Sequence, residues 1–275
     1  MDRERLHQTL RTALERASRL ASRLLIPERC AACRALLLSG ESLLCRCCRE
    51  TLIELPQDRC PRCALPDTGG VLCPSCAADP PPFTRTHAGF VYGAAIADVI
   101  WRLKYRNAPQ AARALAGLCL DAAREDLFWC GLIVPIPLHP SRLRRRGFNQ
   151  SALLTRALIQ ELRPACRTAP FALRRIRATP AQVGQRGADR LMNVRGAFKA
   201  DERWVLGSRV LLIDDVMTTG ATAREAARAA MDAGAQEVRV FCAARACGGG
   251  NWALGRPEVA APASGVDVDK PKDGS

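Results

Sequence analysis

Four cysteine pairs with identical internal spacing constrain the fold of this chain more than any other feature of its sequence. Two residues separate the cysteines of each pair, and the pairs follow one another after eleven, eleven and nine residues. A C-x-x-C turn presents two thiolates to one metal ion, and a second such turn completes a closed tetrahedral site. The sequence therefore predicts two structural Zn²⁺ ions with eight ligands: Cys30, Cys33, Cys45, Cys48, Cys60, Cys63, Cys73 and Cys76.

The spacing allows two ways of pairing the turns. Neighbouring turns can share a metal, as in tandem zinc ribbons, or a cross-braced arrangement can join the first turn to the third. Cys47 lies inside the second turn, where it could replace a neighbouring ligand, and is interpreted as a spare thiol. Because residues 28–80 offer little apolar surface, metal binding is expected to supply much of the folding free energy of this double zinc-ribbon module.

Composition narrows the class of protein. Fourteen cysteines would also suit a secreted disulfide framework, but the strict pairing and the lack of a signal-peptide pattern argue against it. No segment approaches the roughly 18 consecutive apolar residues of a membrane span. We therefore expect a cytoplasmic protein. A net charge of +14 favours anionic partners, either phosphorylated small molecules or nucleic acid.

The rest of the chain divides by pattern. Residues 1–27 carry leucines and alanines at helical spacing, which predicts an amphipathic helix. Three prolines at 80–82 indicate a stiff linker. Over 83–247 apolar strands alternate with helices, which predicts an α/β domain with a parallel sheet flanked by helices. The expected strands are 132–138, 210–213 and 237–243, and the expected helices are 109–128, 150–163 and 221–233. Residues 248–275 have the composition of a disordered tail.

The most informative stretch of the α/β domain is 210–222. An apolar strand leads into Asp214 and Asp215, then into a Thr/Gly loop and the start of a helix. The N–H groups of such a loop and the positive end of the helix dipole form a nest for a phosphate, and Gly220 permits close approach. The two carboxylates cannot favour a phosphate, so they serve vicinal sugar hydroxyls or a hydrated Mg²⁺. An ordinary strand, turn and capped helix is the alternative interpretation.

This stretch resembles the phosphoribosyl pyrophosphate (PRPP) binding motif of type I phosphoribosyltransferases. The resemblance implies that Asp214 and Asp215, as the catalytic pair, hold the ribose hydroxyls. Purine-salvage members of that superfamily have an aspartate where this chain has Thr218, so purine salvage is disfavoured. The resemblance also implies that the 5′-phosphate is bound by Met217, Thr218, Thr219, Gly220, Ala221 and Thr222.

Further segments extend the resemblance to the ComF/GntX family over roughly residues 26–246. They are the cysteine pairs, RRGFNQS at 145–151, RIRATPAQ at 175–182, the run 190–193 and Phe198. Arg145 and Arg146 belong to a basic cluster after the strand 132–138, together with His139, Arg142 and Arg144. The planar guanidinium groups of its arginines suit the pyrophosphate of PRPP.

Two other segments are given roles by resemblance. The segment 174–190 lacks strand periodicity and is predicted to be a mobile loop, similar to the loop that closes over PRPP in glutamine-dependent amidotransferases. Lys104 and Tyr105, expected after a helix, would belong to a hood over the acceptor site. The loop residues that would fold over the ligand are Gln182, Arg186, Arg190 and Asn193.

Three functional hypotheses follow. The chain is a phosphoribosyltransferase for an unidentified acceptor, acting on PRPP with Mg²⁺. Alternatively, it is a DNA-handling protein that binds single-stranded DNA and works with DNA-uptake machinery, because ComF relatives are associated with DNA uptake and use; its PRPP site is then regulatory or vestigial. In the third hypothesis the chain is a PRPP sensor that has lost turnover.

Overall fold

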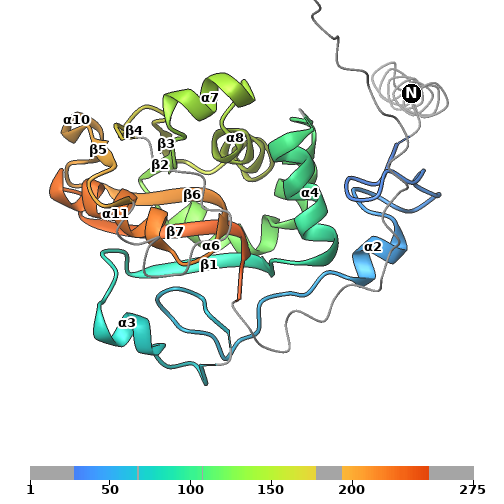
Figure 1. The fold of residues 1–275 in the computed structure, drawn as a ribbon, viewed down its shortest axis with the longest axis horizontal. Helices are drawn as coiled ribbons and strands as arrows, with labels where there is room; N and C mark the ends of the chain where they lie inside the picture. The colour runs from blue at the N-terminus through green and yellow to red at the C-terminus, as the bar shows by residue number, and fades with distance from the viewer. Residues whose placement is uncertain (1–27, 67, 107, 178–193, 248–275) are drawn as a thin grey trace, which may run out of the picture.

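A parallel five-stranded sheet forms the centre of the molecule (Figure 1). The computed structural model describes residues 28–66, 68–106, 108–177 and 194–247. The strand order is β1-β7-β6-β2-β3, and every pair is parallel. A separate antiparallel ribbon joins β4 (Leu173–Arg175) to β5 (Phe198–Ala200). The strands of the main sheet are β1 (Arg85–Val91), β2 (Leu132–Pro135), β3 (Arg167–Thr168), β6 (Arg209–Met217) and β7 (Glu237–Arg245).

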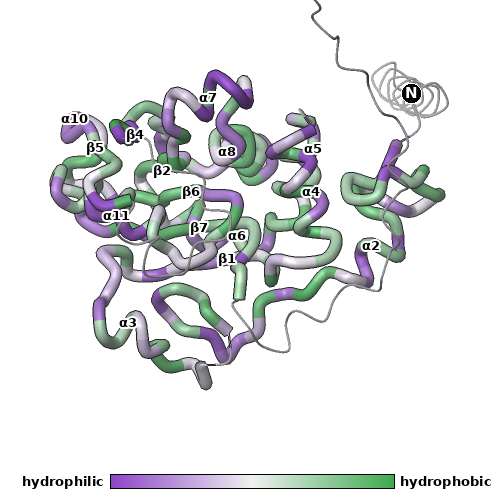
Figure 2. The backbone as a smooth tube through the Cα atoms, viewed as in Figure 1, coloured by the Kyte–Doolittle hydropathy of each residue, from purple (hydrophilic) through white to green (hydrophobic). Residues whose placement is uncertain are grey.

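The two faces of the sheet are buried in separate cores. Successive side chains of a strand point to opposite faces, so Leu211 and Ile213 join one core while Val210 and Leu212 join the other. We call these the first and the second face. Figure 2 shows the apolar character of β2 and β6, as expected for parallel strands covered on both sides. The predicted α/β fold is confirmed.

Helices cover both faces. The first face is covered by α4 (Ala94–Tyr105), α5 (Ala111–Leu118), α6 (Leu120–Trp129) and α8 (Gln150–Leu162). The second face is covered by α11 (Ala221–Asp232) and the short α10 (Glu202–Val205). A hydrophilic helix, α7 (Pro140–Arg146), follows β2 and lies at the periphery (Figures 1 and 2).

The two cysteine-rich segments pack on opposite cores. The first segment contains α2 (Arg46–Glu50), and its Cys30, Ala32 and Leu44 are buried with the first face. The second contains α3 (Pro74–Ala78), and Ala64 within it is buried with the second face. Between them the chain follows β1, where Val91 N–H donates to the carbonyl of Ile53 at 2.8 Å. In Figure 1 one segment therefore lies beside α4 and the other below β1.

Several expected elements have different limits in the structure. The predicted helix 109–128 is two helices, because Cys119 leaves helical geometry (φ −102°, ψ 5°) and its thiol packs against β1 at Gly89. The strand expected over 132–138 ends at Pro135, since two closely spaced prolines, at 135 and 137, offer no N–H to a ladder. The helices expected at 150–163 and 221–233 are present as α8 and α11.

Three differences from the predicted elements concern the site directly. The strand predicted over 210–213 continues to Met217, because β7 extends to Arg245 and keeps pairing with it; the two acids therefore lie within β6. The segment predicted as a loop over 174–190 begins as strand, since Arg174 and Arg175 pair with β5. Lys104 lies in the last turn of α4 and not beyond it.

Other predictions lie outside the described residues. These are the helix 1–27, the tail 248–275 and the loop residues Gln182, Arg186, Arg190 and Asn193. The predicted boundary at residues 80–83 stays a prediction. Among the described residues, no helix has the length and apolar character that crossing a membrane would require.

Candidate functional site

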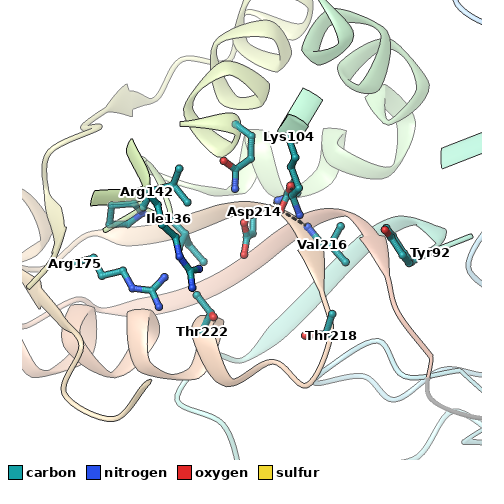
Figure 3. A pocket seen from close by; sticks show the side chains of 13 residues that line it. Tyr92, Lys104, Ile136, Arg142, Arg175, Asp214, Val216, Thr218 and Thr222 are labelled. Carbon is teal, nitrogen blue, oxygen red and sulfur yellow. Dashed lines mark hydrogen bonds and ion pairs between the residues drawn. The ribbon is translucent and has the colours of Figure 1, made fainter. Parts of the chain in front are cut away.

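A pocket of about 300 Å³ opens where β2 and β6 end, at the edge of the sheet at which α/β proteins bind ligands. Figure 3 shows Arg142 and Arg175 on one side of Asp214 and Tyr92 on the other, with Lys104 approaching from α4. The lining residues come from β6, α4, α7, α8, β4 and α11 and from the connections that follow β1, β2 and β6. They are Tyr92, Lys104, Ile136, Pro137, Leu138, Arg142, Gln150, Arg175, Asp214, Asp215, Val216, Thr218 and Thr222.

The two adjacent carboxylates have different surroundings. Asp214 accepts hydrogen bonds from the hydroxyl of Ser151 at 3.0 Å and from the N–H of Asp215 at 2.9 Å. Burial, followed by repulsion from Asp215, raises the pKa of Asp214 to about 7, although Lys104 opposes this shift. Asp215 is only 3% exposed and pairs with the Lys104 ammonium, with Nζ 2.7 Å from Oδ2. Asp214 is therefore the carboxylate that changes charge near neutral pH.

Lys104 gives the site a buried counter-charge. Burial by itself would lower its pKa, but the charge of Asp215, the hydrogen bond to it and the charge of Asp214 together raise the pKa of Lys104. Sequence reasoning placed Lys104 in a hood and did not connect it with the acids, because the two partners lie more than 100 residues apart in the chain. A lysine in the last turn of an amphipathic helix was the only available signal.

Arginines occupy the opposite side of the pocket. Arg175 stacks over the ring of Phe198, with its guanidinium carbon 5.3 Å from the ring centroid. Burial, and then the charge of Arg142, lowers the pKa of Arg175 to about 10, well above neutrality. Arg142 and Arg175 thus line the same pocket as Asp214. Arg142 belongs to the basic cluster that the sequence predicts for pyrophosphate, whereas Arg175, in the segment 175–182, was given no role in the site.

The two arginines that were expected there lie elsewhere. Arg145 is exposed in α7 and does not line the pocket. Arg146 donates to Gln150 Oε1 at 2.6 Å and stacks over the ring of Tyr105 at 5.5 Å. Their helix is followed by Gly147 in the left-handed region (φ 82°), which turns the chain so that Asn149 caps α8. Arg146 therefore reaches the site indirectly, through Gln150.

Residues 217–222, which we call the phosphate loop, join β6 to α11. Met217, Gly220 and Ala221 are buried, while Thr218 and Thr222 line the pocket and Thr219 is exposed. Gly220 has φ 79°, a left-handed conformation that favours glycine. The N–H groups of Thr218, Thr219 and Gly220 donate to no acceptor within the described ranges. The loop thus offers free backbone donors beside the two carboxylates, as the sequence predicts for a phosphate nest.

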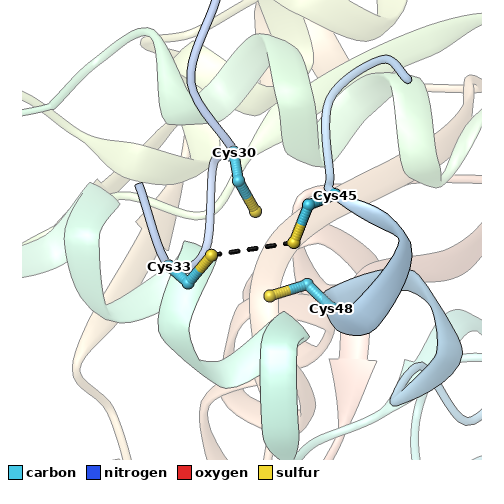
Figure 4. A group of neighbouring side chains, drawn as sticks. All are labelled: Cys30, Cys33, Cys45 and Cys48. Atoms are coloured by element: carbon cyan, nitrogen blue, oxygen red, sulfur yellow. Dashed lines mark hydrogen bonds between the residues drawn. The ribbon is translucent and has the colours of Figure 1, made fainter. Parts of the chain in front are cut away.

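Each cysteine-rich segment gathers four thiols. Cys30, Cys33, Cys45 and Cys48 converge in Figure 4, and Cys60, Cys63, Cys73 and Cys76 form the second group, all within 4.8 Å of one another in each group. This is the pairing of neighbouring turns, so the cross-braced alternative is wrong. Cys47 belongs to neither group. We call the two segments the first and the second zinc ribbon.

The thiols suit Zn²⁺ in spacing and chemistry. The Sγ atoms of Cys33 and Cys45 are 3.7 Å apart, as are those of Cys63 and Cys73. Tetrahedral coordination with Zn–S bonds of about 2.3 Å places sulfur atoms roughly 3.8 Å apart. Burial would raise the pKa of Cys30, but hydrogen bonds from backbone N–H groups, led by that of Cys45, outweigh it and lower the pKa to about 7. The same combination lowers the pKa of Cys60 to about 7.

Comparison with known proteins agrees with both parts of this architecture. Residues 21–77 match the model of the double zinc ribbon domain, and residues 149–251 match that of the phosphoribosyl transferase domain. DNA utilization protein YhgH of Escherichia coli (strain K12) is 34% identical over 228 residues, which are 81% of this chain and 99% of that protein. The chain belongs to the ComF/GntX family.

Other relatives support membership of the ComF/GntX family. Competence protein F of Haemophilus influenzae is 30% identical over 79% of this chain and 97% of its own length, and competence protein ComFC of Bacillus subtilis is 27% identical over 72% and 82%. Among solved structures, glutamine PRPP amidotransferase from B. subtilis has a TM-score of 0.30 at 20% identity. That weak match covers 51% of this chain and 26% of the amidotransferase.

Proposed function

We propose that this ComF/GntX protein binds PRPP with Mg²⁺ in the pocket over β6 and transfers the phosphoribosyl group to an acceptor. One observation carries the proposal: the carboxylates of Asp214 and Asp215 stand between a loop with free N–H donors and a pair of arginines. PRPP has the matching order of groups, with a phosphate at one end, two hydroxyls in the middle and a pyrophosphate at the other end.

Each part of the pocket receives one part of the ligand in this proposal. The phosphate loop takes the 5′-phosphate through backbone donors and the hydroxyls of Thr218 and Thr222. Asp214, once ionised, accepts hydrogen bonds from the ribose hydroxyls. Lys104 neutralises Asp215, so the paired acids can face a polyanion without uncompensated repulsion.

Arg142 and Arg175 are assigned to the pyrophosphate. Guanidinium groups pair with phosphate oxygens in a bidentate manner and stay charged at neutral pH. Mg²⁺, which prefers carboxylate and phosphate oxygens, would be held beside Asp214 and Asp215 and would supply charge neutralisation for the leaving pyrophosphate. The acidic pair lines the pocket, so this donor set fits the ion.

Transfer then needs little covalent chemistry from the protein. The acceptor nucleophile forms a bond to the anomeric carbon while the bond from that carbon to the pyrophosphate oxygen breaks. The arginines stabilise the charge that develops on pyrophosphate, and the loop holds the ribose in position. Thr218 stands where purine-salvage members of the superfamily have an aspartate, so the acceptor must lose its proton to another group.

Calorimetric titration of the zinc-loaded protein with PRPP and Mg²⁺ tests the proposal. We expect saturable binding that is lost, or weakened at least 100-fold, in the Asp214→Asn/Asp215→Asn double variant. Arg145→Gln is the matched control, because Arg145 is exposed and lies off the pocket. Binding that survives the double substitution would remove these acids from the site. Release of pyrophosphate in the presence of candidate acceptors would then identify turnover.

A second candidate function is the handling of single-stranded DNA. Trp101 and Tyr105 are 44% and 62% exposed on α4, one turn apart, with ring centroids separated by 6.1 Å. Arg106 stacks over Trp101 at 4.9 Å and Arg146 over Tyr105 at 5.5 Å. Exposed aromatic rings with arginines provide base stacking and phosphate attraction. The names of relatives that refer to DNA utilization and competence also favour this function.

The two functions can be separated by substitution. Single-stranded oligonucleotide binding, followed by fluorescence anisotropy, should weaken about tenfold or more in Trp101→Ala/Tyr105→Ala and should fall steeply with salt. Asp214→Asn/Asp215→Asn should leave this binding unchanged. DNA affinity that is insensitive to the aromatic pair would argue against α4 as the contact surface.

A further inference from the structure

A single side chain connects the second zinc ribbon with the phosphate loop. Arg245 is the last residue of β7, where it pairs with Met217 of β6, and only 5% of its surface is exposed. Its Nε donates to the carbonyl of Cys63 at 2.8 Å. Its Nη1 donates to the carbonyls of Met217, at 3.2 Å, and of Thr218. One guanidinium therefore binds a ligand turn of the zinc site and the first two carbonyls of the loop.

The requirements of this position fit arginine. Besides the carbonyls of Cys63, Met217 and Thr218, the guanidinium also reaches the carbonyl of Ala246, the next residue in the chain, through Nη1. Guanidinium carries five donors in a rigid planar fork, whereas lysine has three donors on one rotating nitrogen. Within the described residues Arg245 makes no ion pair with a carboxylate, but its charge acts on the Cys63 thiol and favours its thiolate. Four thiolates around one Zn²⁺ would leave the second site with a net negative charge, which suits a neighbouring guanidinium.

Holding these carbonyls determines where the loop N–H groups point. A trans peptide unit is planar, with its C=O and N–H directed oppositely. The carbonyls of Met217 and Thr218 face Arg245, so the N–H groups of Thr218 and Thr219 are directed away from it. Those are two of the donors that meet no acceptor within the described ranges. Arg245 thereby prepares the loop for an anion before the anion arrives.

A second contact ties the same ribbon to the helix that follows the loop. Asp79, three residues after the last ligand of the second site, accepts from Nη1 of Arg224 at 3.1 Å. Arg224 lies in the first turns of α11 and is 7% exposed. The second ribbon therefore holds the phosphate loop at its entry through Arg245 and at its exit through Arg224.

From these contacts we propose that Arg245 is a positioning residue for the phosphate loop, through which the metal-bound second ribbon sets the affinity of the loop for a phosphate monoester. The part that names PRPP as the ligand rests on the proposed function. The conformational part does not, because the contacts exist in the protein without ligand. Release of metal from the second site frees the Cys63 carbonyl, loosens the loop and lowers phosphate affinity.

Hydrogen exchange of the full-length, zinc-loaded protein tests the conformational part without ligand. The readout is the peptide that spans residues 217–224. We expect Arg245→Gln to raise its exchange rate about tenfold while two zinc ions stay bound, and Arg245→Lys to restore the rate only in part. Cys60→Ser, which leaves Arg245 in place, should raise the same rate. Cys33→Ser is the matched control, because it disrupts the other site. Unchanged exchange in Arg245→Gln and Cys60→Ser would overturn the proposal.

Titration with PRPP and Mg²⁺ tests the ligand part on the same proteins. We expect Arg245→Gln and Cys60→Ser each to weaken binding about tenfold, and the double variant to be scarcely weaker than either, because both act through one contact. If the wild type binds PRPP and Arg245→Gln binds it equally well, the inference is wrong. If the wild type does not bind PRPP but the exchange pattern is as expected, the assignment of PRPP is wrong and Arg245 still positions the loop.

Discussion

The two zinc ribbons have nearly identical ligand spacing, yet they attach to different parts of the molecule. The first is buried with the core that contains α4, and Thr51 just beyond it accepts a hydrogen bond from the N–H of Ala95 at 3.4 Å. The second is buried with the core that contains α11 and reaches the phosphate loop through Arg245. One ribbon thus supports the helix that carries Lys104, and the other supports the loop that offers N–H donors.

From this difference we expect one metal motif, used twice, to support two halves of a single pocket independently. The sites also differ in exposure. Cys33 of the first site is exposed and Cys45 and Cys48 are half-buried, whereas Cys60, Cys73 and Cys76 are 1–2% exposed. The first site is therefore open to solvent and competing ligands, while the second is enclosed by the domain that it supports.

Removal of both metals should have the largest effect. Structural Zn²⁺ contributes roughly 10 kcal/mol or more to the folding of such modules, so chelation should unfold residues 28–79 while leaving much of the sheet. Mass spectrometry of the native protein should find two zinc ions per chain, and Cys30→Ser or Cys60→Ser should each lose one. Cys47→Ser should keep both. Fewer than two ions in the wild type would contradict the eight-ligand assignment.

Loss of the Lys104 charge should affect the half of the pocket that the first ribbon supports. Lys104→Met leaves Asp215 almost fully buried without its partner, so we expect a loss of about 2 kcal/mol in the free energy of unfolding. The expected loss is smaller than for a fully buried ion pair, because the lysine side chain is 22% exposed. Lys199→Met, at an exposed position in β5, should be nearly neutral. Urea titrations of the two variants measure the difference, and equal midpoints would contradict this role of Lys104.

The pH dependence of stability should come from Asp214. The pKa of Asp214 is raised from its ordinary value of 3.8 to about 7 in the folded protein, so between these values the folded state retains a proton that the unfolded state has lost. This contribution is full below about pH 4 and disappears as the pH rises through about 7. Melting temperatures should therefore fall more steeply over this window in the wild type than in Asp214→Asn. PRPP affinity should rise over the same window, since the ionised form accepts the ribose hydroxyls.

The pH profile also distinguishes the ribbons. Lys104 lowers the pKa of Asp214, and Lys104 is carried by the helix that packs against the first ribbon. Cys33→Ser should thus move the midpoint of the profile to higher pH, while Cys60→Ser should leave it in place. A titration of the Asp214 carboxyl by NMR would measure both shifts. Equal shifts in the two variants would show that the ribbons do not act on separate halves.

The smallest effect is expected in the rate of metal release. Exposed thiolates are accessible to a chelator or an oxidant, whereas buried ones require local opening. A coloured zinc chelator should therefore remove the two ions in separate phases, with the first ribbon releasing its ion several-fold faster. Cys33→Ser should abolish the fast phase alone. A single phase would mean that the two sites open together.

The ligands of both metals and the motif 210–222 could be predicted from the sequence because their spacing is local. Thiol pairs at fixed distance and two acids after an apolar strand determine their chemistry within a few residues. The partners of those acids could not be found in this way. Lys104 meets Asp215 only because α4 packs over the end of β6, and Arg175 reaches the pocket from a strand that has just three residues.

Short elements with weak patterns account for most of the differences in the fold. β4 and β5 have three residues each, which is too few for a period of two to be recognised. The length of β6 was underestimated because charged residues normally end a strand pattern, whereas here pairing with β7 continues past both acids. Arg245 was missed because its role depends on carbonyls from two distant segments, the turn at Cys63 and the loop at Met217 and Thr218.

The position of β1 affects how the molecule is made. β1 follows the second ribbon, and in the main sheet it pairs with β7, the last strand of the described residues. On a ribosome, both ribbons can take up zinc once about 80 residues have emerged, but the edge of β1 that pairs with β7 stays open for more than 140 residues. Unpaired strand edges are prone to aggregation. Metal loading can therefore come before the sheet and the pocket close, because both must wait for β7.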